Sequence, residues 1–348
     1  MSLFKISWKK VPLKLKNVFT ISRSSRSEVV NVFIMIERNG IVGYGEASPN
    51  NRYDETPEKV IAYFEELPAA FFDEITSADE IPNALERIKL NPVESARVAI
   101  EMAWLDWWAK SNNQPLWKLW GETTSVGPVT SYTIGIDTPE VMQKKVLEAE
   151  RYPLYKIKLG TKSDRQIIAA IREVTDKPLR VDANEGWKTL EQAKREIEFL
   201  TTQNVELIEQ PMPALDFENM KKLRKWSPLP CVADESFKGT EDLNAIAEAF
   251  DIINIKLMKM GSLVKARKVI EKAHQLGLKV MIGCMIESSL ANAAGAVIAL
   301  NAEYSDLDGH LLIENDPFSG LRVNKKCRVV LSKRHGLGVQ EIDGLFSG

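Results

Sequence analysis

The sequence predicts an α/β protein in which a (β/α)7β barrel of the TIM type carries an α+β capping domain. The middle of the chain alternates short apolar runs with amphipathic helical stretches, as parallel barrels do. The first third instead gives strands followed by helices. The chain has 348 residues, which is enough to bury a large core in each of two domains.

The capping domain is predicted over residues 1–125. Strand-like sequence extends to about residue 50, and Asn39-Gly40 within it is a strong signal for a two-residue hairpin turn. Helical patterns follow over 56–111, and the last of them begins at Pro92, a residue suited to a first helical turn. A polar segment with a proline, 111–115, then ends this helix.

The barrel is predicted over residues 126–313. Its strands are expected in eight apolar runs: VTSYTIGI, LYKIKLG, PLRVDANEG, VELIEQP, PCVADES, IINIKLM, KVMIGCMIES and YSDLDGH. Seven helical stretches lie between these runs, among them 163–175, 188–202 and 261–276. The alternation stops near Glu314, and the tail, 314–348, is expected to return to the capping domain.

Composition and charge exclude several classes of protein. Hydrophobic residues make up 44% of the chain, charged residues 27%, and the net charge is −2, so nothing in the bulk charge favours nucleic acid or an anionic membrane. The three cysteines are odd in number and widely spaced, which fits a reducing cytoplasm rather than a disulfide framework or a zinc motif. The weakly polar run 289–300 is shorter than the roughly 20 residues that span a bilayer, and it predicts a buried helix.

A polar residue of a particular kind stands at the end of each apolar run. These residues are Thr133, Lys158, Asp182, Glu209, Asp234, Lys256, Glu287 and Asp308. The gaps between them are 25, 24, 27, 25, 22, 31 and 21 residues, each close to one strand–helix unit. The carboxyl ends of all barrel strands meet at one mouth, where active sites lie, so we expect these side chains to share a cavity. Capping of the following helices would explain an Asp or two, but the positive helix N-terminus disfavours lysine.

Three of these residues, Asp182, Glu209 and Asp234, lie on consecutive predicted strands. Carboxylates that converge on one point repel each other unless a cation lies between them. Oxygen ligands without histidine or cysteine select a hard ion, and Mg²⁺ is the ion expected here.

Lysines flank the predicted metal site on two sides. Lys156 and Lys158 alternate on the strand before the metal strands and point the same way, and Lys256 ends the strand after them. A nearby dication and a neighbouring ammonium group would each lower a lysine pKa towards neutrality. A metal with a base on each side suggests that a proton is removed from carbon beside a carboxylate and returned to the opposite face, which is racemisation or epimerisation.

At this point the residues resemble the enolase superfamily, muconate-lactonising subgroup, and within it the dipeptide epimerases of the alanine–glutamate type. Nearly the whole chain carries the resemblance, in the motifs GYGEASP, ARVAIEMAWLDWWAK, PLWKLWG, the K-x-K of Lys156 and Lys158, VDANEGW, IEQP, ADES and NIKLMK. Enolase-type sites are known to combine lysine bases with magnesium ions that stabilise an enediolate. The combination of lysines and magnesium is therefore part of the resemblance.

The resemblance implies a role for each residue of the mouth. Asp182, Glu209 and Asp234 would bind one Mg²⁺ per subunit. Lys158 and Lys256 would be the acid/base pair, and Lys156 would help to hold the substrate carboxylate. Asp306 and Asp308, in the sequence SDLDGH, would hold the α-ammonium of a dipeptide. One of these two aspartates could instead be a helix cap or a turn residue.

The remaining pocket residues each have more than one possible role. By analogy Thr133 and Cys284 line the pocket, although Cys284 could equally be a small buried hydrophobe. A loop over 19–28 is expected to close the mouth, and its Arg23 or Arg26 would pair with a substrate glutamate carboxylate or serve as a surface or structural arginine. For His310, near the mouth, a structural hydrogen bond is favoured over contact with substrate.

The leading hypothesis is a cytoplasmic, Mg²⁺-dependent isomerase that inverts the α-carbon of the C-terminal residue of dipeptides such as Ala-Ala or Ala-Glu. The first alternative is an o-succinylbenzoate synthase or N-succinylamino-acid racemase, whose substrates lack the ammonium group that two aspartates would bind. The second is a non-catalytic peptide-binding barrel, which the intact metal ligands and bases disfavour. The expected partner is a small dipeptide, with no nucleic acid and no membrane; barrels of this type often form homo-oligomers, but the sequence does not fix how.

Overall fold

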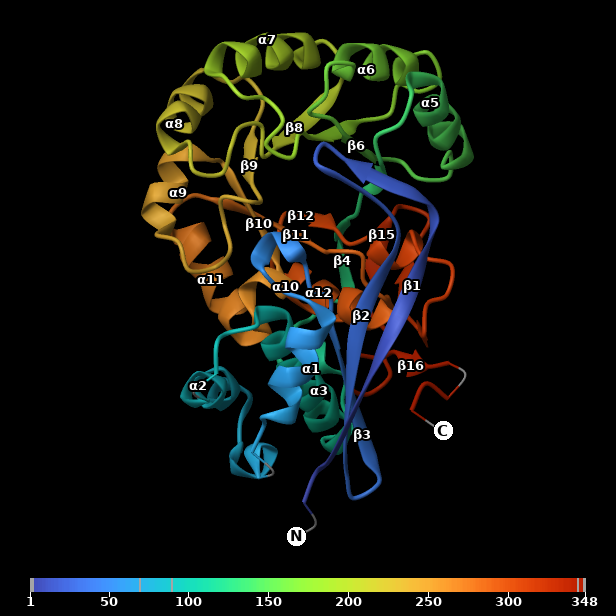
Figure 1. Cartoon of the computed structure of the whole chain (residues 1–348), viewed down its shortest axis with the longest axis vertical. Coiled ribbons are helices and arrows are strands. Elements are labelled where there is room, and N and C mark those ends of the chain that lie inside the picture. Colours follow the sequence, from blue (N-terminus) through green and yellow to red (C-terminus); the bar gives the residue numbers. More distant parts are fainter. Residues whose placement is uncertain (1–2, 69, 89, 343, 347–348) are drawn as a thin grey trace.

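The computed structural model describes residues 3–68, 70–88, 90–342 and 344–346. It contains a parallel eight-stranded sheet surrounded by helices, and a three-stranded antiparallel sheet whose long hairpin reaches the barrel (Figure 1). The predicted fold class, a barrel with an α+β cap, is confirmed.

The capping sheet consists of three antiparallel strands. They are β1 (Lys5–Ile21), β2 (Ser24–Arg38) and β3 (Ile41–Ala47). The turn between β2 and β3 places Asn39 at φ 55° and Gly40 at φ 74°. Positive φ at both central residues is what a tight hairpin turn requires, so the predicted Asn-Gly hairpin is confirmed.

The helices of the cap pack on this sheet. They are α1 (Pro57–Glu65), α2 (Ile81–Arg87), α3 (Glu94–Ser111) and α4 (Leu116–Leu119), with 3-10 turns η1 (Asn51–Tyr53), η2 (Phe71–Glu74) and η3 (Ala78–Glu80). A Cβ at Gly43 would lie 2.1 Å from the carbonyl oxygen of Ala103, so only glycine lets α3 approach β3 this closely. The helix expected from Pro92 begins at Glu94, because Val93 is extended and the Glu55 carboxylate accepts a hydrogen bond from Glu94 N at 2.6 Å.

The barrel strands follow one another in chain order around the sheet. They are β5 (Tyr132–Ile134), β6 (Tyr155–Lys158), β7 (Leu179–Asp182), β8 (Val205–Glu209), β9 (Cys231–Ala233), β10 (Ile252–Lys256), β11 (Lys279–Gly283) and β12 (Tyr304–Asp306). A parallel bridge between Thr130 and Ser305 joins the two ends of the sheet. The eight predicted runs are therefore the eight barrel strands.

Helices connect the barrel strands and cover their outer face (Figure 1). They are α5 (Pro139–Glu148), α6 (Asp164–Arg172), α7 (Leu190–Thr201), α8 (Phe217–Trp226), α9 (Leu243–Ala249), α10 (Leu257–Met260), α11 (Leu263–Gln275) and α12 (Ser289–Ala299). Every residue of α12 is buried, as its sequence predicts. Within the described ranges, no helix has the length and apolar character needed to cross a membrane, and the three cysteines are free thiols.

The C-terminal tail packs beside the capping sheet. After η4 (Gly309–Leu311) it forms β13 (Phe318–Ser319), β14 (Arg322–Val323), β15 (Arg328–Val330) and β16 (Gln340–Glu341), and β15 pairs with β4 (Val126–Val129). Tyr44 Oη donates a hydrogen bond to Glu341 Oε2 at 2.7 Å, and the Phe318 ring stacks on Phe33. The strand β4 lies inside the predicted barrel range but pairs with a strand of the tail. The domain limits 1–125, 126–313 and 314–348 stay a prediction.

The segment 19–28, expected as a loop, is instead the tip of the β1–β2 hairpin. Phe19 pairs with Arg26 and Ile21 with Ser24 in the antiparallel register, which leaves only a tight turn at the tip. The carbonyl oxygen of Thr20 accepts a hydrogen bond from Ile136 N at 2.8 Å. This bond fixes the hairpin tip over the carboxyl end of β5 and closes one side of the mouth.

Candidate active site

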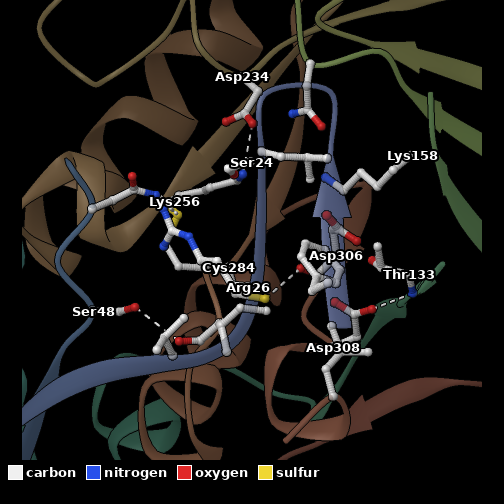
Figure 2. Close-up of a pocket in the computed structure, with 18 of the residues that line it drawn as sticks. Ser24, Arg26, Ser48, Thr133, Lys158, Asp234, Lys256, Cys284, Asp306 and Asp308 are labelled. Atoms are coloured by element: carbon white, nitrogen blue, oxygen red, sulfur yellow. Dashed lines mark hydrogen bonds and ion pairs between the residues drawn. The ribbon is translucent and has the colours of Figure 1, made fainter. Parts of the chain in front are cut away.

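A cavity of about 120 Å³ lies at the carboxyl ends of the barrel strands, beneath the hairpin tip (Figure 2). The predicted residues that line it are Arg23, Arg26, Thr133, Lys156, Lys158, Asp234, Lys256, Cys284, Asp306 and Asp308. The strand-end spacing in the sequence therefore predicted side chains that do share one cavity.

Three carboxylates form a cluster at the floor of this cavity. Lys158, Asp182 and Glu209 occupy matching positions on β6, β7 and β8, so their side chains reach the same layer. Asp234 follows β9 directly. One oxygen from each of the three carboxylates lies within 4.8 Å of the others, and all three residues are buried.

Each carboxylate has one oxygen fixed by a donor outside the cluster. The donors are Asn184 N to Asp182 Oδ1 at 2.9 Å, Asn254 Nδ2 to Glu209 Oε1 at 3.0 Å, and Lys259 Nζ to Asp234 Oδ1 at 2.7 Å. This arrangement turns the second oxygen of each carboxylate towards the lysines of the mouth.

The second oxygens face ammonium groups. The ion pairs are Lys158 Nζ to Asp182 Oδ2 at 2.6 Å, Lys156 Nζ to Glu209 Oε2 at 2.7 Å and Lys256 Nζ to Asp234 Oδ2 at 2.9 Å. Glu209 Oε2 is buried and, among the described residues, has no hydrogen-bond partner besides this ion pair. Three converging carboxylates, one with an oxygen free of hydrogen bonds, fit a hard divalent cation such as Mg²⁺.

The charges of the cluster shift the pKa values of its members. Burial disfavours the carboxylate of Asp234, but the charges of Lys256 and Lys259 outweigh it and lower its pKa well below the usual range. Burial, with repulsion from Asp182, raises the pKa of Glu209 to about 8. Glu209 is therefore the carboxylate that most needs a further positive charge to stay ionised.

The pKa values of Lys156 and Lys256 are raised by neighbouring carboxylates, and the lowering that the sequence predicted for a lysine beside a dication stays a prediction. Burial disfavours each ammonium group, yet the charge of Asp306 raises the pKa of Lys156, and the charge of Asp234 raises that of Lys256. A carboxylate stabilises the charged form of a neighbouring lysine, so it acts in the opposite direction to a dication. Burial lowers the pKa of Lys259, against the charge of Asp234.

The two aspartates of SDLDGH both reach the cavity. Asp306 accepts hydrogen bonds from Ser131 Oγ and Lys156 Nζ, each at 2.6 Å, and Asp308 accepts one from Thr133 N at 2.6 Å. Burial disfavours both carboxylates, but Lys156 lowers the pKa of Asp306 to about 2. Asp308 has no ion pair among the described residues, and burial with the charge of Asp306 raises its pKa to about 6. The two carboxylates concentrate negative charge in this part of the cavity, and their predicted binding of an ammonium group stays a prediction.

Cys284 is half-buried at the edge of the cavity. Its thiol donates to Asp306 O at 3.3 Å and accepts a hydrogen bond from Gly309 N at 3.3 Å. Burial, with the charge of Glu287, raises the pKa of the thiol well above its ordinary value. A neutral thiol held in this way forms part of the wall and is a poor nucleophile.

The two arginines of the hairpin tip differ in their partners. Arg23 Nη2 lies 2.7 Å from Glu235 Oε1, and Arg23 Nη1 lies 3.7 Å from Glu185 Oε2, which also pairs with Arg52 at 2.6 Å. Arg23 therefore ties the hairpin to the barrel loops. Arg26 lines the cavity and has no carboxylate partner among the described residues.

Two residues near the mouth differ from expectation. Glu287 follows β11 but does not line the cavity; its Oε1 accepts a hydrogen bond from Met285 N at 2.7 Å, which turns the side chain back onto its own loop. His310 does not line the cavity either, and its buried Nδ1 has no hydrogen-bond partner among the described residues, so the structural hydrogen bond expected of it is not found at that nitrogen.

Sequence reasoning missed Tyr53, Asn184 and Lys259. Tyr53 reaches the cavity from η1 in the capping domain, and nothing in the strand-end spacing could signal it. Asn184 lines the cavity from the loop after β7. Lys259 stands three residues after Lys256, in NIKLMK, and that spacing was a usable signal because residues i and i+3 of a helical turn share a face.

Two family models match the chain. Residues 5–121 match the mandelate racemase / muconate lactonizing enzyme N-terminal domain, and residues 141–343 match the enolase C-terminal domain-like family. Together the two models cover most of the capping domain, the barrel and the tail.

Characterised relatives extend along nearly the whole chain. An L-Ala-D/L-Glu epimerase from Bacteroides thetaiotaomicron is 38% identical over 332 residues, covering 95% of this chain and 86% of its own length. An L-Ala-D/L-amino acid epimerase from Pedosphaera parvula is 38% identical over 338 residues, covering 94% and 96%. An N-succinyl-L-Arg/Lys racemase from Bacillus cereus is 30% identical over 347 residues, covering 95% and 93%.

Solved structures show the same fold. The dipeptide epimerase from Cytophaga hutchinsonii, complexed with Mg and the dipeptide D-Ala-L-Val, superposes with a TM-score of 0.90 at 27% identity and covers 100% of this chain and 98% of its own. The dipeptide epimerase from Enterococcus faecalis, complexed with Mg and L-Leu-L-Tyr, gives 0.88 at 30% identity, covering 98% and 100%.

Proposed function

The chain belongs to the mandelate racemase / muconate lactonizing enzyme family, and from this premise we propose that it is a Mg²⁺-dependent dipeptide epimerase. It inverts the α-carbon of the C-terminal residue of alanine-containing dipeptides by moving one proton off that carbon and another onto its opposite face. The enzyme is an isomerase, and its cofactor is magnesium, as in the dipeptide epimerase complexes that share its fold.

One observation carries the proposal: the cavity holds a lysine on each side of a carboxylate cluster. Lys158 ends β6 and Lys256 ends β10, with the three acidic strand ends between them. Figure 2 shows these two lysines entering the cavity from different strands. An inversion through two bases requires this placement, because the proton leaves one face of the carbon and arrives at the other.

The carboxylates of the cluster and the lysine beside them would have different roles in the reaction. Asp182, Glu209 and Asp234 are the residues that would hold Mg²⁺. When bound, the ion supplies positive charge against the substrate carboxylate and the negative charge that develops there. Lys156, which is already surrounded by acidic oxygens, contributes a further positive charge to the same carboxylate.

The substrate's own charge fits the rest of the cavity. Asp306 and Asp308 would receive the α-ammonium of the dipeptide, next to Thr133 and Cys284. Arg26, which has no acidic partner among the described residues, would receive an anionic side chain on the C-terminal residue, such as glutamate. Arg23 is less suited to that role because Glu235 and Glu185 already pair with it.

The cellular location of the enzyme is part of the same proposal. Three free thiols, two of them buried, fit a cytoplasmic protein. Self-association into a homo-oligomer stays a prediction, as does the assignment of residues 1–125 and 314–348 to one capping domain.

The second candidate is an N-succinylamino-acid racemase or o-succinylbenzoate synthase. The Bacillus cereus relative, an N-succinyl-L-Arg/Lys racemase, favours this reading. The pair Asp306 and Asp308 disfavours it, since a succinylated amine carries no positive charge and brings a second carboxylate towards them. A non-catalytic peptide-binding barrel is a distant third, because the proposed metal ligands converge and both proposed bases line the cavity.

The proposal is tested by hydrogen exchange. The protein is incubated with Mg²⁺ and a library of dipeptides in D₂O, and ¹H NMR follows deuterium incorporation at each carbon. We expect deuterium at the α-carbon of the C-terminal residue alone, together with formation of the second diastereomer. Turnover of a succinylated amino acid without exchange in any dipeptide would instead establish the second candidate, and no turnover of either would favour the third.

A further inference from the structure

Lys259 is a fully enclosed ammonium group beside the proposed metal site. Lys256 ends β10, and the short helix α10 turns Lys259 back towards the same carboxylate, Asp234. The side chain of Lys259 is 1% exposed. Such a burial is costly for a charged group unless its hydrogen bonds are complete.

The hydrogen bonds of Lys259 are complete. Its Nζ donates to Asp234 O at 2.5 Å, to Asp234 Oδ1 at 2.7 Å and to Phe237 O at 2.8 Å. Three close acceptors match the three N–H groups of an ammonium. Lys259 thus holds the backbone and the side chain of Asp234 at once, which fixes the rotation of this carboxylate.

The other two carboxylates of the cluster are held by neutral donors. Asp182 is held by a backbone N–H and Glu209 by the Asn254 amide. Among the described residues, Asp234 is the carboxylate of the cluster whose outer oxygen, Oδ1, is held by a charged side chain. Lys256 lies on the same side, 2.9 Å from Asp234 Oδ2. The two oxygens of Asp234 are therefore divided between two lysines with different environments.

We propose that Lys259 is a positioning residue for the Lys256 face of the reaction: by occupying Asp234 Oδ1 it directs Oδ2 towards the cavity and fixes the place of the Lys256 ammonium. This inference rests on the proposed epimerase function. It predicts an asymmetry, because among the described residues the donor to Asp182 Oδ1, on the Lys158 side, is the backbone N–H of Asn184 rather than a lysine. Loss of Lys259 should therefore impair one face of the α-carbon more than the other.

The experiment compares exchange from the two diastereomers of a dipeptide substrate. The variants Lys158→Ala and Lys256→Ala first establish which diastereomer presents its α-hydrogen to which lysine. Lys259→Met then removes the charge and the hydrogen bonds while keeping the length of the side chain. Lys268→Met is the matched control, because Lys268 lies on α11 with a side chain that is 67% exposed and only a distant ion pair with Asp79.

In Lys259→Met we expect exchange from the Lys256-facing diastereomer to fall about 10- to 100-fold further than exchange from the Lys158-facing one. Calorimetric titration with Mg²⁺ alone, without substrate, should show a Kd raised about 10-fold, since Asp234 has lost its anchor. Lys268→Met should match the wild type in both measurements. An equal fall on both faces with unchanged Mg²⁺ affinity, or no change at all, would overturn the proposal.

Two further results have defined meanings. Should Lys259→Met not fold, as judged by circular dichroism, Lys259→Gln is measured in its place, and failure of both to fold would overturn the proposal by showing that Lys259 serves folding alone. Should the wild type exchange no dipeptide, the proposed function fails, and the Mg²⁺ titration decides separately whether Lys259 positions Asp234.

Discussion

Two of the regions in which acidic side chains are buried differ in how the carboxylates are paired. At the barrel mouth, Asp182, Glu209 and Asp234 converge and face lysines. At the contact between the capping domain and the barrel, Glu46 and Glu101 are each alone, and no ion pair is found for either within the described ranges.

The solitary glutamates cap helices of the barrel. Glu46, on β3, accepts hydrogen bonds from Ser288 N at 2.9 Å and from Ala291 N at 3.2 Å, at the start of α12. Glu101, on α3, accepts one from Val264 N at 2.8 Å, in the first turn of α11. The N–H groups at a helix start lack intrahelical partners, so a carboxylate from the cap completes them and joins the two parts of the protein.

The comparison shows that burial alone does not mark a functional carboxylate. Burial raises the pKa of Glu46 and of Glu101 to about 7, although hydrogen bonds from the helix starts act against it. It also raises the pKa of Glu209 to about 8. What separates the mouth is convergence, because several like charges within 4.8 Å of one another require cations and can share one.

The largest effect is expected from the lysines that face the cluster. Lys158→Ala and Lys256→Ala should each lower the rate of epimerisation about 10⁴-fold, since each removes the base proposed for its face. One variant should still exchange the α-hydrogen of a single diastereomer, measured by NMR in D₂O. Unaltered epimerisation rates in both variants would remove the two-base mechanism.

Removal of one converging carboxylate should be nearly as severe. Glu209→Gln keeps the shape of the side chain but removes a charge from the cluster, and we expect kcat/KM to fall about 10³-fold. Mg²⁺ should also cease to raise the Tm of this variant. Glu46→Gln, the matched change in the other region, should keep the Mg²⁺-dependent rise in Tm; its loss there would end the distinction between the two regions.

The proposed ammonium site should give a smaller, substrate-dependent effect. Asp306→Asn should raise KM for a dipeptide about 30-fold or more, because a buried charge loses its partner. An N-acetylated dipeptide, which has no ammonium group, should not show this penalty. The measurement is steady-state kinetics with both substrates, and an unchanged KM for the free dipeptide would undo the assignment.

The smallest effect is expected where the cap meets the barrel, and it concerns stability. The folded-state pKa of about 7 for Glu46 and Glu101 lies above the ordinary value, so the folded protein binds more protons than the unfolded chain between about pH 4.5 and 7. The free energy of unfolding should therefore fall as pH rises through this range. Between pH 5 and 8 the wild type should lose about 2–3 kcal/mol for each of the two glutamates more than a Glu46→Gln, Glu101→Gln double variant. Urea denaturation at both pH values measures this, and parallel losses would contradict it.

Much of the mouth could be predicted because a barrel repeats. Each strand ends at the same layer, so residues about 25 apart, such as Lys158, Asp182 and Glu209, come together whatever the helices between them do. The same logic failed for Glu287, because the chain beyond β11 bends back and the side chain follows its own loop. Repetition predicts which residues reach a layer, but not how an irregular segment turns after it.

Residues of the capping domain show a second limit of prediction from the sequence. The sequence placed Arg23 and Arg26 near the mouth but could not separate them, since their difference depends on Glu235 and Glu185, some 160 to 210 residues further along the chain. Tyr53 entered the cavity without any local signal. These positions follow from how the cap docks on the barrel, which no short-range pattern encodes.

By itself, the sequence determined the alternation of strands and helices, the layer that collects acids and lysines, and hence the kind of cation and base chemistry to expect. Periodicity is a local property, and a closed barrel converts it into proximity. Only the tertiary structure decided which oxygen of each carboxylate faces the cavity, which arginine has no carboxylate partner among the described residues, and which lysine fixes Asp234. Those outcomes depend on contacts of a few ångströms between distant segments, and such contacts exist only once the chain has packed.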